Sequence, residues 1–286
     1  MTIFIQGLRR SGTTILYDVL SEDDKLSCFY EPLSLGKASY GGGSGMRREN
    51  VMRSLSAARI REGYLGGAGG DPRLNYGAPT NYRLEARRGC LTNEIKNYLS
   101  TIAGGDSLLK FTRATFFAKD LYDLDSRAVF IHIKKDPRRF VASHMCVKSY
   151  GSKLCSDPTL FFSKKSGFNQ WSQEYISNFY LRENKEEYLN RPAYFKLLYL
   201  WKEFNEVTRE TAGHLFKKDY IGVTAEELYF DQAKIINCIY NKIGRKAPNR
   251  VLAWAKSNVR KPRGILFEKD SRWQSAFDEI GIKIEK

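Results

Sequence analysis

The sequence contains no run of apolar residues that approaches the roughly 18 needed to span a lipid bilayer. It also shows no basic segment followed by an apolar stretch near its start, which is the pattern of a secretory signal. On these two absences we expect a soluble cytoplasmic protein without a membrane span.

Cysteine and histidine are also scarce, with five and three residues respectively among 286. The cysteines are odd in number, form no C-x-x-C pair and have no histidine at metal-ligand spacing. We therefore expect them to be reduced and structural, and we expect no metal site. They are Cys28, Cys90, Cys146, Cys155 and Cys238.

Acidic residues are too few to balance the basic ones, since 32 Asp and Glu face 47 Lys and Arg, a formal net charge of +15. A field of this size attracts polyanions of any kind. Nucleic acid, a nucleotide with several phosphates and an acidic glycan would each account for the charge, which does not choose among them. Hydrophobic residues at 42% and aromatic residues at 13% argue against wholesale disorder.

Short apolar runs alternate with segments of helical periodicity along most of the chain. The clearest run, at 128–133, is of the near-continuous kind found in buried parallel strands. The alternation predicts a three-layer α/β fold with a central, mainly parallel sheet, formed by a single domain over residues 1–286. Strands are predicted at 3–5, 26–30, 107–111, 128–133 and 219–223, and helices after residue 12, at 91–102, from 138, at 194–211 and at 232–243.

Residues 36–82 interrupt this pattern, because glycine is frequent there, notably at 41–43 and 66–70. A long loop inside a compact domain is usually functional or disordered. The segment is therefore either a lid or ligand-binding insert, or an excursion on the surface.

The first predicted strand runs into a turn bounded by Gly7 and Gly12, and the turn runs into a helix. Glycines permit a tight turn and close approach of the backbone to a ligand, and a helix N-terminus favours negative charge. The spacing matches a P-loop, but Thr13 stands where a lysine contacts the outer phosphates of a nucleoside triphosphate. The cations come earlier, at Arg9 and Arg10, which indicates an anion of another kind.

The run Arg10-Ser11-Gly12-Thr13-Thr14 resembles the 5′-phosphosulfate loop of the sulfotransferases that use PAPS (3′-phosphoadenosine 5′-phosphosulfate). The resemblance implies a P-loop NTPase-like fold and assigns Arg9 and the residues of this run to donor binding. It also implies that Arg10 stabilises the charge that develops on the donor during transfer.

A second basic segment follows the predicted strand at 128–133. In parallel α/β sheets ligands bind at the carboxyl ends of the strands, so this segment should face the same crevice as the first loop. It resembles the 3′-phosphate motif of the same family, with Lys135 at the arginine position and Ser143 eight residues later. A cation and a hydroxyl from one corner can converge on one phosphate, although lysine lacks the bidentate fork of arginine.

Two later segments are also similar to the family. Residues 201–205 and 219–228 resemble its late helix, strand and turn. Residues 259–264 resemble the basic loop that closes over the nucleotide, which assigns Arg260 and Lys261 to donor binding, although Pro262 replaces the usual glycine.

Glu31 is the predicted general base, because it ends a strand beside the first strand-helix unit, where its carboxylate would point into the crevice. Residues 30–33 also resemble the Glu-Pro segment of carbohydrate and tyrosyl-protein sulfotransferases, whose base is a glutamate. The aryl and steroid enzymes use a histidine after a Lys-Thr pair, and residues 110–113 here contain none. His144 is the alternative base.

The resemblance as a whole implies in-line sulfuryl transfer from PAPS to a hydroxyl or amine of a carbohydrate or small natural product. The spent donor would be 3′,5′-ADP, and no metal is required. Lys110 and Arg113 would either line the acceptor site or be solvated charges at a strand end.

Two other functions fit parts of the sequence. A P-loop kinase of small molecules would use ATP and magnesium, but Thr13 replaces its lysine and no aspartate ends the strand at 128–133 to hold the metal. A non-catalytic, basic nucleic-acid-binding protein would explain the charge. It would leave unexplained the two loops whose predicted geometry and charge suit an anion, and the chain contains no recognised nucleic-acid module.

Overall fold

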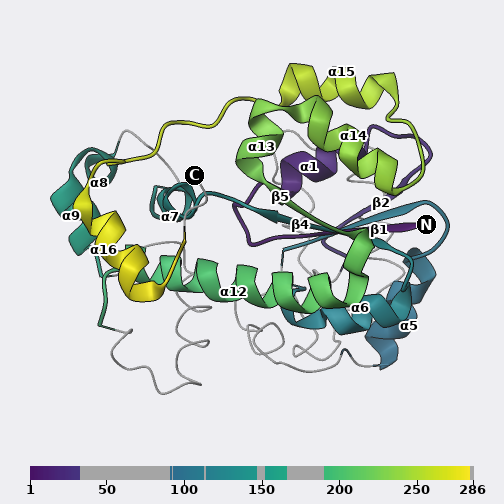
Figure 1. Cartoon of the computed structure of the whole chain (residues 1–286), viewed down its shortest axis with the longest axis horizontal. Coiled ribbons are helices and arrows are strands. Elements are labelled where there is room, and N and C mark those ends of the chain that lie inside the picture. Colours follow the sequence, from purple (N-terminus) through teal and green to yellow (C-terminus); the bar gives the residue numbers. More distant parts are fainter. Residues whose placement is uncertain (33–90, 92, 113, 147–151, 166–189, 284–286) are drawn as a thin grey trace, which may run out of the picture.

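A five-stranded sheet forms the centre of the fold, with its strands in the order β2-β3-β1-β4-β5 (Figure 1). Every pairing within it is parallel, which confirms the predicted α/β class, and each predicted strand overlaps an observed one. The strands are β1 (Thr2–Gln6), β2 (Ser27–Tyr30), β3 (Ser107–Phe111), β4 (Val129–Lys134) and β5 (Tyr220–Thr224).

This computed structural model describes residues 1–32, 91, 93–112, 114–146, 152–165 and 190–283. The glycine-rich insert predicted at 36–82 lies outside the described residues, as do Cys90 and Arg113. The interpretations offered for them therefore stay predictions.

Helices cover both faces of the sheet and form the outer two of the three predicted layers (Figure 1). Alternating side chains of β1 explain why, since Ile3 and Ile5 enter one core and Phe4 enters the other. The first core is covered by α1 (Thr13–Leu20), α13 (Ala225–Phe230), α14 (Gln232–Lys242) and α15 (Asn249–Asn258). The second is covered by α5 (Asn93–Ile102), α6 (Ala118–Leu124) and the C-terminal part of α12 (Ala193–Phe216).

A third cluster of buried side chains lies around the N-terminal half of α12. Its aromatic residues pack closely, with the ring centroid of Trp273 5.9 Å from that of Phe161 and 5.0 Å from that of Phe162. The 24-residue α12 therefore joins this cluster to the sheet. The other helices of the cluster are α7 (Pro137–Met145), α8 (Lys153–Ser156), α9 (Pro158–Ser163) and α16 (Ser271–Ile280). Short 3-10 turns lie at Thr115–Phe117 and Lys217–Asp219.

Several observed helices were not predicted from the sequence, and α13 occupies a segment that was predicted to be a turn. Local capping explains α13, because the Thr224 hydroxyl accepts from the Glu227 N–H while the Glu227 carboxylate accepts from the Thr224 N–H. The α16 helix likewise starts at an N-cap, Asp270, whose carboxylate accepts from the Arg272 N–H. Within the described ranges, no helix combines the length and the apolar character that crossing a bilayer requires.

The prediction that all cysteines are reduced is wrong for two of them. Cys146 and Cys155 are joined in a disulfide, with their Cα atoms 6.4 Å apart. The bond ties the C-terminus of α7 to α8, and both residues are buried in the cluster around α12. The two cysteines are nine residues apart, a spacing that matches no recognised cysteine motif, and tertiary packing brings them together. Cys28 and Cys238 are free thiols.

We expect the double substitution Cys146→Ser and Cys155→Ser to lower the free energy of unfolding by about 2–3 kcal/mol, because closing a short loop removes entropy from the unfolded chain. Urea unfolding of parent and variant, with and without a thiol reductant, measures this. Reductant should lower the stability of the parent and leave the double variant unchanged. The control is Cys238→Ser at an exposed free thiol. A parent whose stability ignores the reductant would contradict the expectation.

Candidate functional site

The loop between β1 and α1 has the strand-turn-helix geometry that its glycines predict. Gly7 lies so close to β4 that a Cβ atom there would be 2.2 Å from the carbonyl oxygen of Ile133. Gly12 is the N-cap of α1 and has φ of 95°, a left-handed conformation that glycine adopts without strain. The loop is therefore held against the carboxyl end of β4.

Two features of this loop are unusual for a simple strand-to-helix turn. Arg10 is exposed and has a positive φ of 73°, which is uncommon for a residue other than glycine and is concentrated at functional sites. The Ser11 side chain is fully buried, yet within the described part of the chain its hydroxyl has no hydrogen-bond partner. The backbone N–H of Ser11 already donates a hydrogen bond of 3.0 Å to the carbonyl of Leu8, so it is not available to a ligand in this conformation.

Lys135 joins this loop to the segment after β4. Its Nζ donates a hydrogen bond of 3.1 Å to the carbonyl oxygen of Arg10. Burial lowers the pKa of Lys135, and the nearby positive charges of Arg10 and Arg139 lower it further, against the attraction of Glu226. The two segments that the sequence assigns to anion binding are thus in contact, and their cations repel one another.

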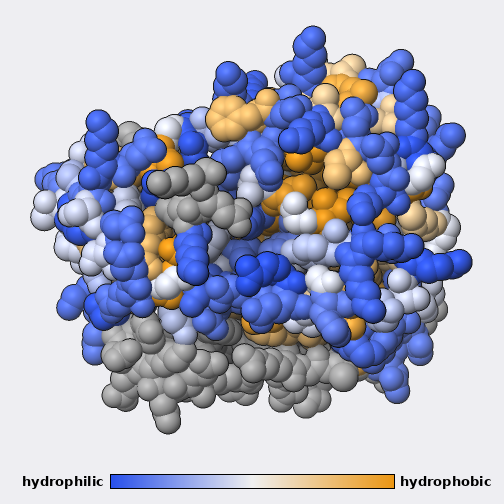
Figure 2. Space-filling view, viewed as in Figure 1, coloured by the Kyte–Doolittle hydropathy of each residue, from blue (hydrophilic) through white to orange (hydrophobic). Residues whose placement is uncertain are grey.

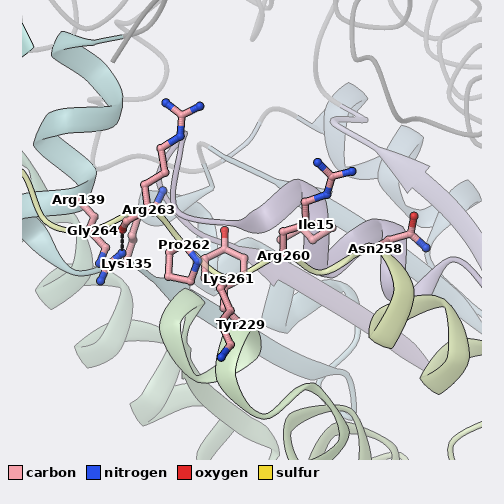
Figure 3. A pocket seen from close by; sticks show the side chains of 10 residues that line it. All are labelled: Ile15, Lys135, Arg139, Tyr229, Asn258, Arg260, Lys261, Pro262, Arg263 and Gly264. Atoms are coloured by element: carbon pink, nitrogen blue, oxygen red, sulfur yellow. Dashed lines mark hydrogen bonds between the residues drawn. The ribbon is translucent and has the colours of Figure 1, made fainter. Parts of the chain in front are cut away.

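A pocket of about 380 Å³ opens beside Lys135 (Figure 3). Half of its lining residues are cationic, and none of them is acidic. Arg260 and Lys261, both exposed, have no ion-pair partner among the residues that the structure describes. In Figure 3 the guanidinium groups of Arg260 and Arg263 extend to the same side of their loop. The lining residues are Ile15, Lys135, Arg139, Tyr229, Asn258, Arg260, Lys261, Pro262, Arg263 and Gly264.

The pocket therefore contains three of the residues predicted to bind the donor, Lys135, Arg260 and Lys261. Sequence reasoning missed Arg139 and Arg263 as further lining cations. Each stands in a basic run that was itself singled out, and the run alone does not say which of its members faces the pocket. Figure 2 shows a mostly hydrophilic face, with hydrophobic side chains gathered over the layer of α1 and α13–α15.

Ser143 and His144 lie on α7, outside the residues that line the pocket. The Ser143 hydroxyl donates to the carbonyl of Phe140 over 2.7 Å. His144 is buried, and its Nδ1 donates to the same carbonyl over 2.9 Å. Burial and the charges of Arg10 and Arg9 lower the pKa of His144 to about 3, which makes it a weak proton acceptor and counts against it as the alternative base.

Glu31 forms a buried ion pair at the carboxyl ends of β2 and β3. Its Oε1 accepts from Lys110 Nζ over 2.6 Å, and its Oε2 accepts from the Thr112 N–H over 3.2 Å. Lys110 is only 1% exposed. Burial by itself would lower the pKa of Lys110, but the attraction of Glu31 and the adjacent Tyr30 raises it. Lys110 is thus a buried partner of Glu31, and the interpretation of Lys110 as a solvated charge is wrong.

Tyr30 connects this ion pair to the first loop. The Tyr30 hydroxyl shares a hydrogen bond of 3.2 Å with the Thr14 hydroxyl, in the first turn of α1. Lys110 Nζ lies 4.2 Å from the centre of the Tyr30 ring, within the range of a cation–π contact. Glu31 itself has a φ of 46°, so its backbone is in a sparsely populated conformation. The predicted base and the predicted anion loop therefore share one chain of contacts.

Comparison with known proteins gives matches among solved structures only, because no family model and no curated protein matches the chain. The sulfotransferase domain from the curacin biosynthetic pathway is 11% identical, covers 99% of this chain and 98% of its own, and has a TM-score of 0.45. The sulfotransferase domain from the Synechococcus PCC 7002 olefin synthase is 15% identical, with coverages of 100% and 89% and a TM-score of 0.44. Likenesses at this level do not assign an activity.

Substituting Lys110→Met should lower the free energy of unfolding by about 3–5 kcal/mol, because Glu31 would stay buried without its counterion. The double variant Lys110→Met, Glu31→Gln should be more stable than Lys110→Met alone, since it removes the unpaired charge. Urea unfolding of the parent, both single variants and the double variant measures the coupling. A loss for Lys110→Met that the second substitution does not reduce would contradict a buried pair.

Two buried histidines should make the fold sensitive to acid. Burial lowers the pKa of His132 from 6.5 to about 4, and that of His144 from 6.5 to about 3. Their contribution to stability is complete above pH 6.5 and is lost as the pH falls towards those values, because the unfolded chain binds the protons first. Within that pH window, each histidine should lower the free energy of unfolding by about 1.4 kcal/mol for each unit by which the pH falls.

Urea unfolding at a series of pH values between 7 and the acid limit of folding checks this dependence. His132→Gln and His144→Gln should each make the fall in stability less steep. A parent whose stability is level between pH 6.5 and pH 5 would show that the two side chains are not neutral in the folded state.

Proposed function

We propose that the chain is a PAPS-dependent sulfotransferase, which moves a sulfuryl group to a hydroxyl or amine of a carbohydrate or small natural product. The observation that carries the proposal is the continuity of two anion-binding features. The pocket has no acidic lining residue, and its Arg260 and Lys261 lack an ion-pair partner among the described residues. It adjoins the Gly7–Gly12 loop through the contact between Lys135 and Arg10. A donor with phosphates at two ends of one nucleoside matches two such features in one crevice.

The residues fit the two ends of this donor. The loop supplies Arg9, Arg10 and residues 11–14 for the 5′-phosphosulfate. The Ser11 hydroxyl has no hydrogen-bond partner within the described residues, but it is buried and would donate to the ligand only after becoming accessible. Lys135, Arg260 and Lys261 would hold the 3′-phosphate. Ser143 would join them only after its hydroxyl leaves the carbonyl of Phe140.

Glu31 is the base in this proposal, and the acceptor would enter beside it. Each of its carboxylate oxygens accepts one hydrogen bond from the protein, and each keeps capacity for another. Lys110 and the Thr112 N–H fix the orientation of the carboxylate, which then takes the proton of the acceptor hydroxyl or amine. Arg10 would stabilise the negative charge on the leaving phosphate oxygens. Bound PAPS supplies the sulfuryl group.

Calorimetry with 3′,5′-ADP and with ATP-magnesium tests the proposal. The parent should bind 3′,5′-ADP in preference to ATP-magnesium. Arg10→Ala and Lys135→Met should each weaken that binding about tenfold or more, because each removes a charged donor to a phosphate. Ser143→Ala, which removes a neutral hydroxyl, should weaken it less. Arg250→Ala is the control, since Arg250 is exposed and pairs with Asp24, away from the pocket.

An acceptor screen with PAPS follows, with Glu31→Gln as the matched variant. This variant should keep its affinity for 3′,5′-ADP, because Glu31 lies outside the residues that line the pocket, and should lose turnover, because it removes the base. It also removes the counterion of the buried Lys110, so urea unfolding of the variant must first show that it is folded under the assay conditions. Preference for ATP-magnesium in the parent would overturn the proposal in favour of a kinase, and indifference to both nucleotides would favour nucleic-acid binding.

A further inference from the structure

Arg139 lies between two elements that meet at the pocket. One of its guanidinium nitrogens, Nη1, donates a hydrogen bond to the carbonyl oxygen of Arg263, and Figure 3 shows this contact. Its Nε lies 3.6 Å from Oε1 of Glu226, in the first turn of α13. Arg139 itself belongs to the first turns of α7. One side chain therefore joins α7, α13 and the basic loop that follows α15.

The basic loop needs such an attachment. Residues 259–265 form neither helix nor strand, and the chain here crosses from α15 to α16 past α13 (Figure 1). Arg260, Lys261, Arg263 and Gly264 are all exposed, so hydrophobic burial does not hold them in place. A hydrogen bond from a cation to a backbone carbonyl is the stronger kind, because the donor is charged.

Glu226 in turn holds Arg139. The Glu226 side chain is largely buried, and its Oε2 accepts from the Asp136 N–H over 3.1 Å. The Asp136 carboxylate pairs with Arg138, and Oε1 of Glu226 faces Arg139. Both Arg139 Nε and Glu226 Oε1 are buried, and neither has a hydrogen-bond partner among the described residues. Their attraction is thus an ion pair at 3.6 Å without a closed hydrogen bond, shielded from water.

We infer that Arg139 is a positioning residue, which Glu226 orients so that its guanidinium fastens the 259–265 loop and holds Arg260 and Lys261 over the pocket. The inference rests on the proposed function only for the identity of the ligand, a nucleotide phosphate. The attachment of the loop is a property of the protein without ligand.

Direct binding of the anion by Arg139 is the competing role, and Glu226→Gln separates the two. The substitution keeps an acceptor for the Asp136 N–H and removes one negative charge near the pocket. If Arg139 bound the anion directly, losing this competing carboxylate would tighten binding. If Arg139 positions the loop, losing the carboxylate that orients it loosens the loop and weakens binding.

The test combines hydrogen-deuterium exchange of the full chain without nucleotide and calorimetry with 3′,5′-ADP. Arg139→Met and Glu226→Gln should raise amide exchange at residues 260–265 and leave β1 and β4 protected. Both should weaken 3′,5′-ADP binding, Arg139→Met by about tenfold. Arg139→Lys should not restore protection, because a single ammonium cannot reach both partners as the fork does. The matched control is Arg138→Met, the same charge change one residue away on a side chain that pairs with Asp136.

Unchanged exchange at 260–265 in Arg139→Met would overturn the inference, as would tighter binding by Glu226→Gln. A parent that does not bind 3′,5′-ADP but shows the expected exchange pattern would overturn the proposed function and leave the role of Arg139 supported. The two failures are therefore distinguishable.

Discussion

The parallel pairing of all five strands is the constraint on which the rest of the structure depends. Parallel strands in register send every strand-to-helix connection out of the same edge of the sheet. Here Tyr30 pairs with Lys110 and Gln6 with both Phe111 and His132, while β4 and β5 continue two residues further, to the pair of Lys134 and Thr224. The five strands therefore end close together at one edge. Segments separated by more than a hundred residues consequently meet along one line, and the side chains just beyond the strands determine the chemistry of that edge.

The charge along this edge is divided into two unlike halves. At β2 and β3 the lysine is neutralised, because Lys110 is buried against Glu31. Beyond β4 the cations outnumber the carboxylates, and Arg260 and Lys261 have no ion-pair partner in the described ranges. The excess of positive charge favours an anionic ligand in the second half. The group transfer that we propose, from an anionic donor to an uncharged acceptor, is consistent with this division of charge.

Contacts through the protein connect the two halves. Tyr30 links the Glu31–Lys110 pair to Thr14 in the first turn of α1, and the loop before that turn links to Lys135 through the carbonyl of Arg10. Gly7 makes this arrangement possible, because any side chain there would displace the loop from β4. The site is thus shaped by backbone placement first, and its side chains are then held by buried hydrogen bonds whose partners come from neighbouring strands.

The amino-acid sequence by itself determined the strands, the glycine-bounded turn after β1 and the basic segment after β4. Apolar runs, glycine spacing and basic clusters are local signals that can be recognised without the tertiary structure. Lys135, Arg260 and Lys261 were indicated by the resemblance of two of these local basic segments to a known family. Only the tertiary structure decided the partners: Lys110 for Glu31, Arg139 for Arg263, Cys146 for Cys155. Ion pairs, disulfides and burial are properties of residues distant in the chain, and no local pattern encodes which of several lysines or cysteines will meet.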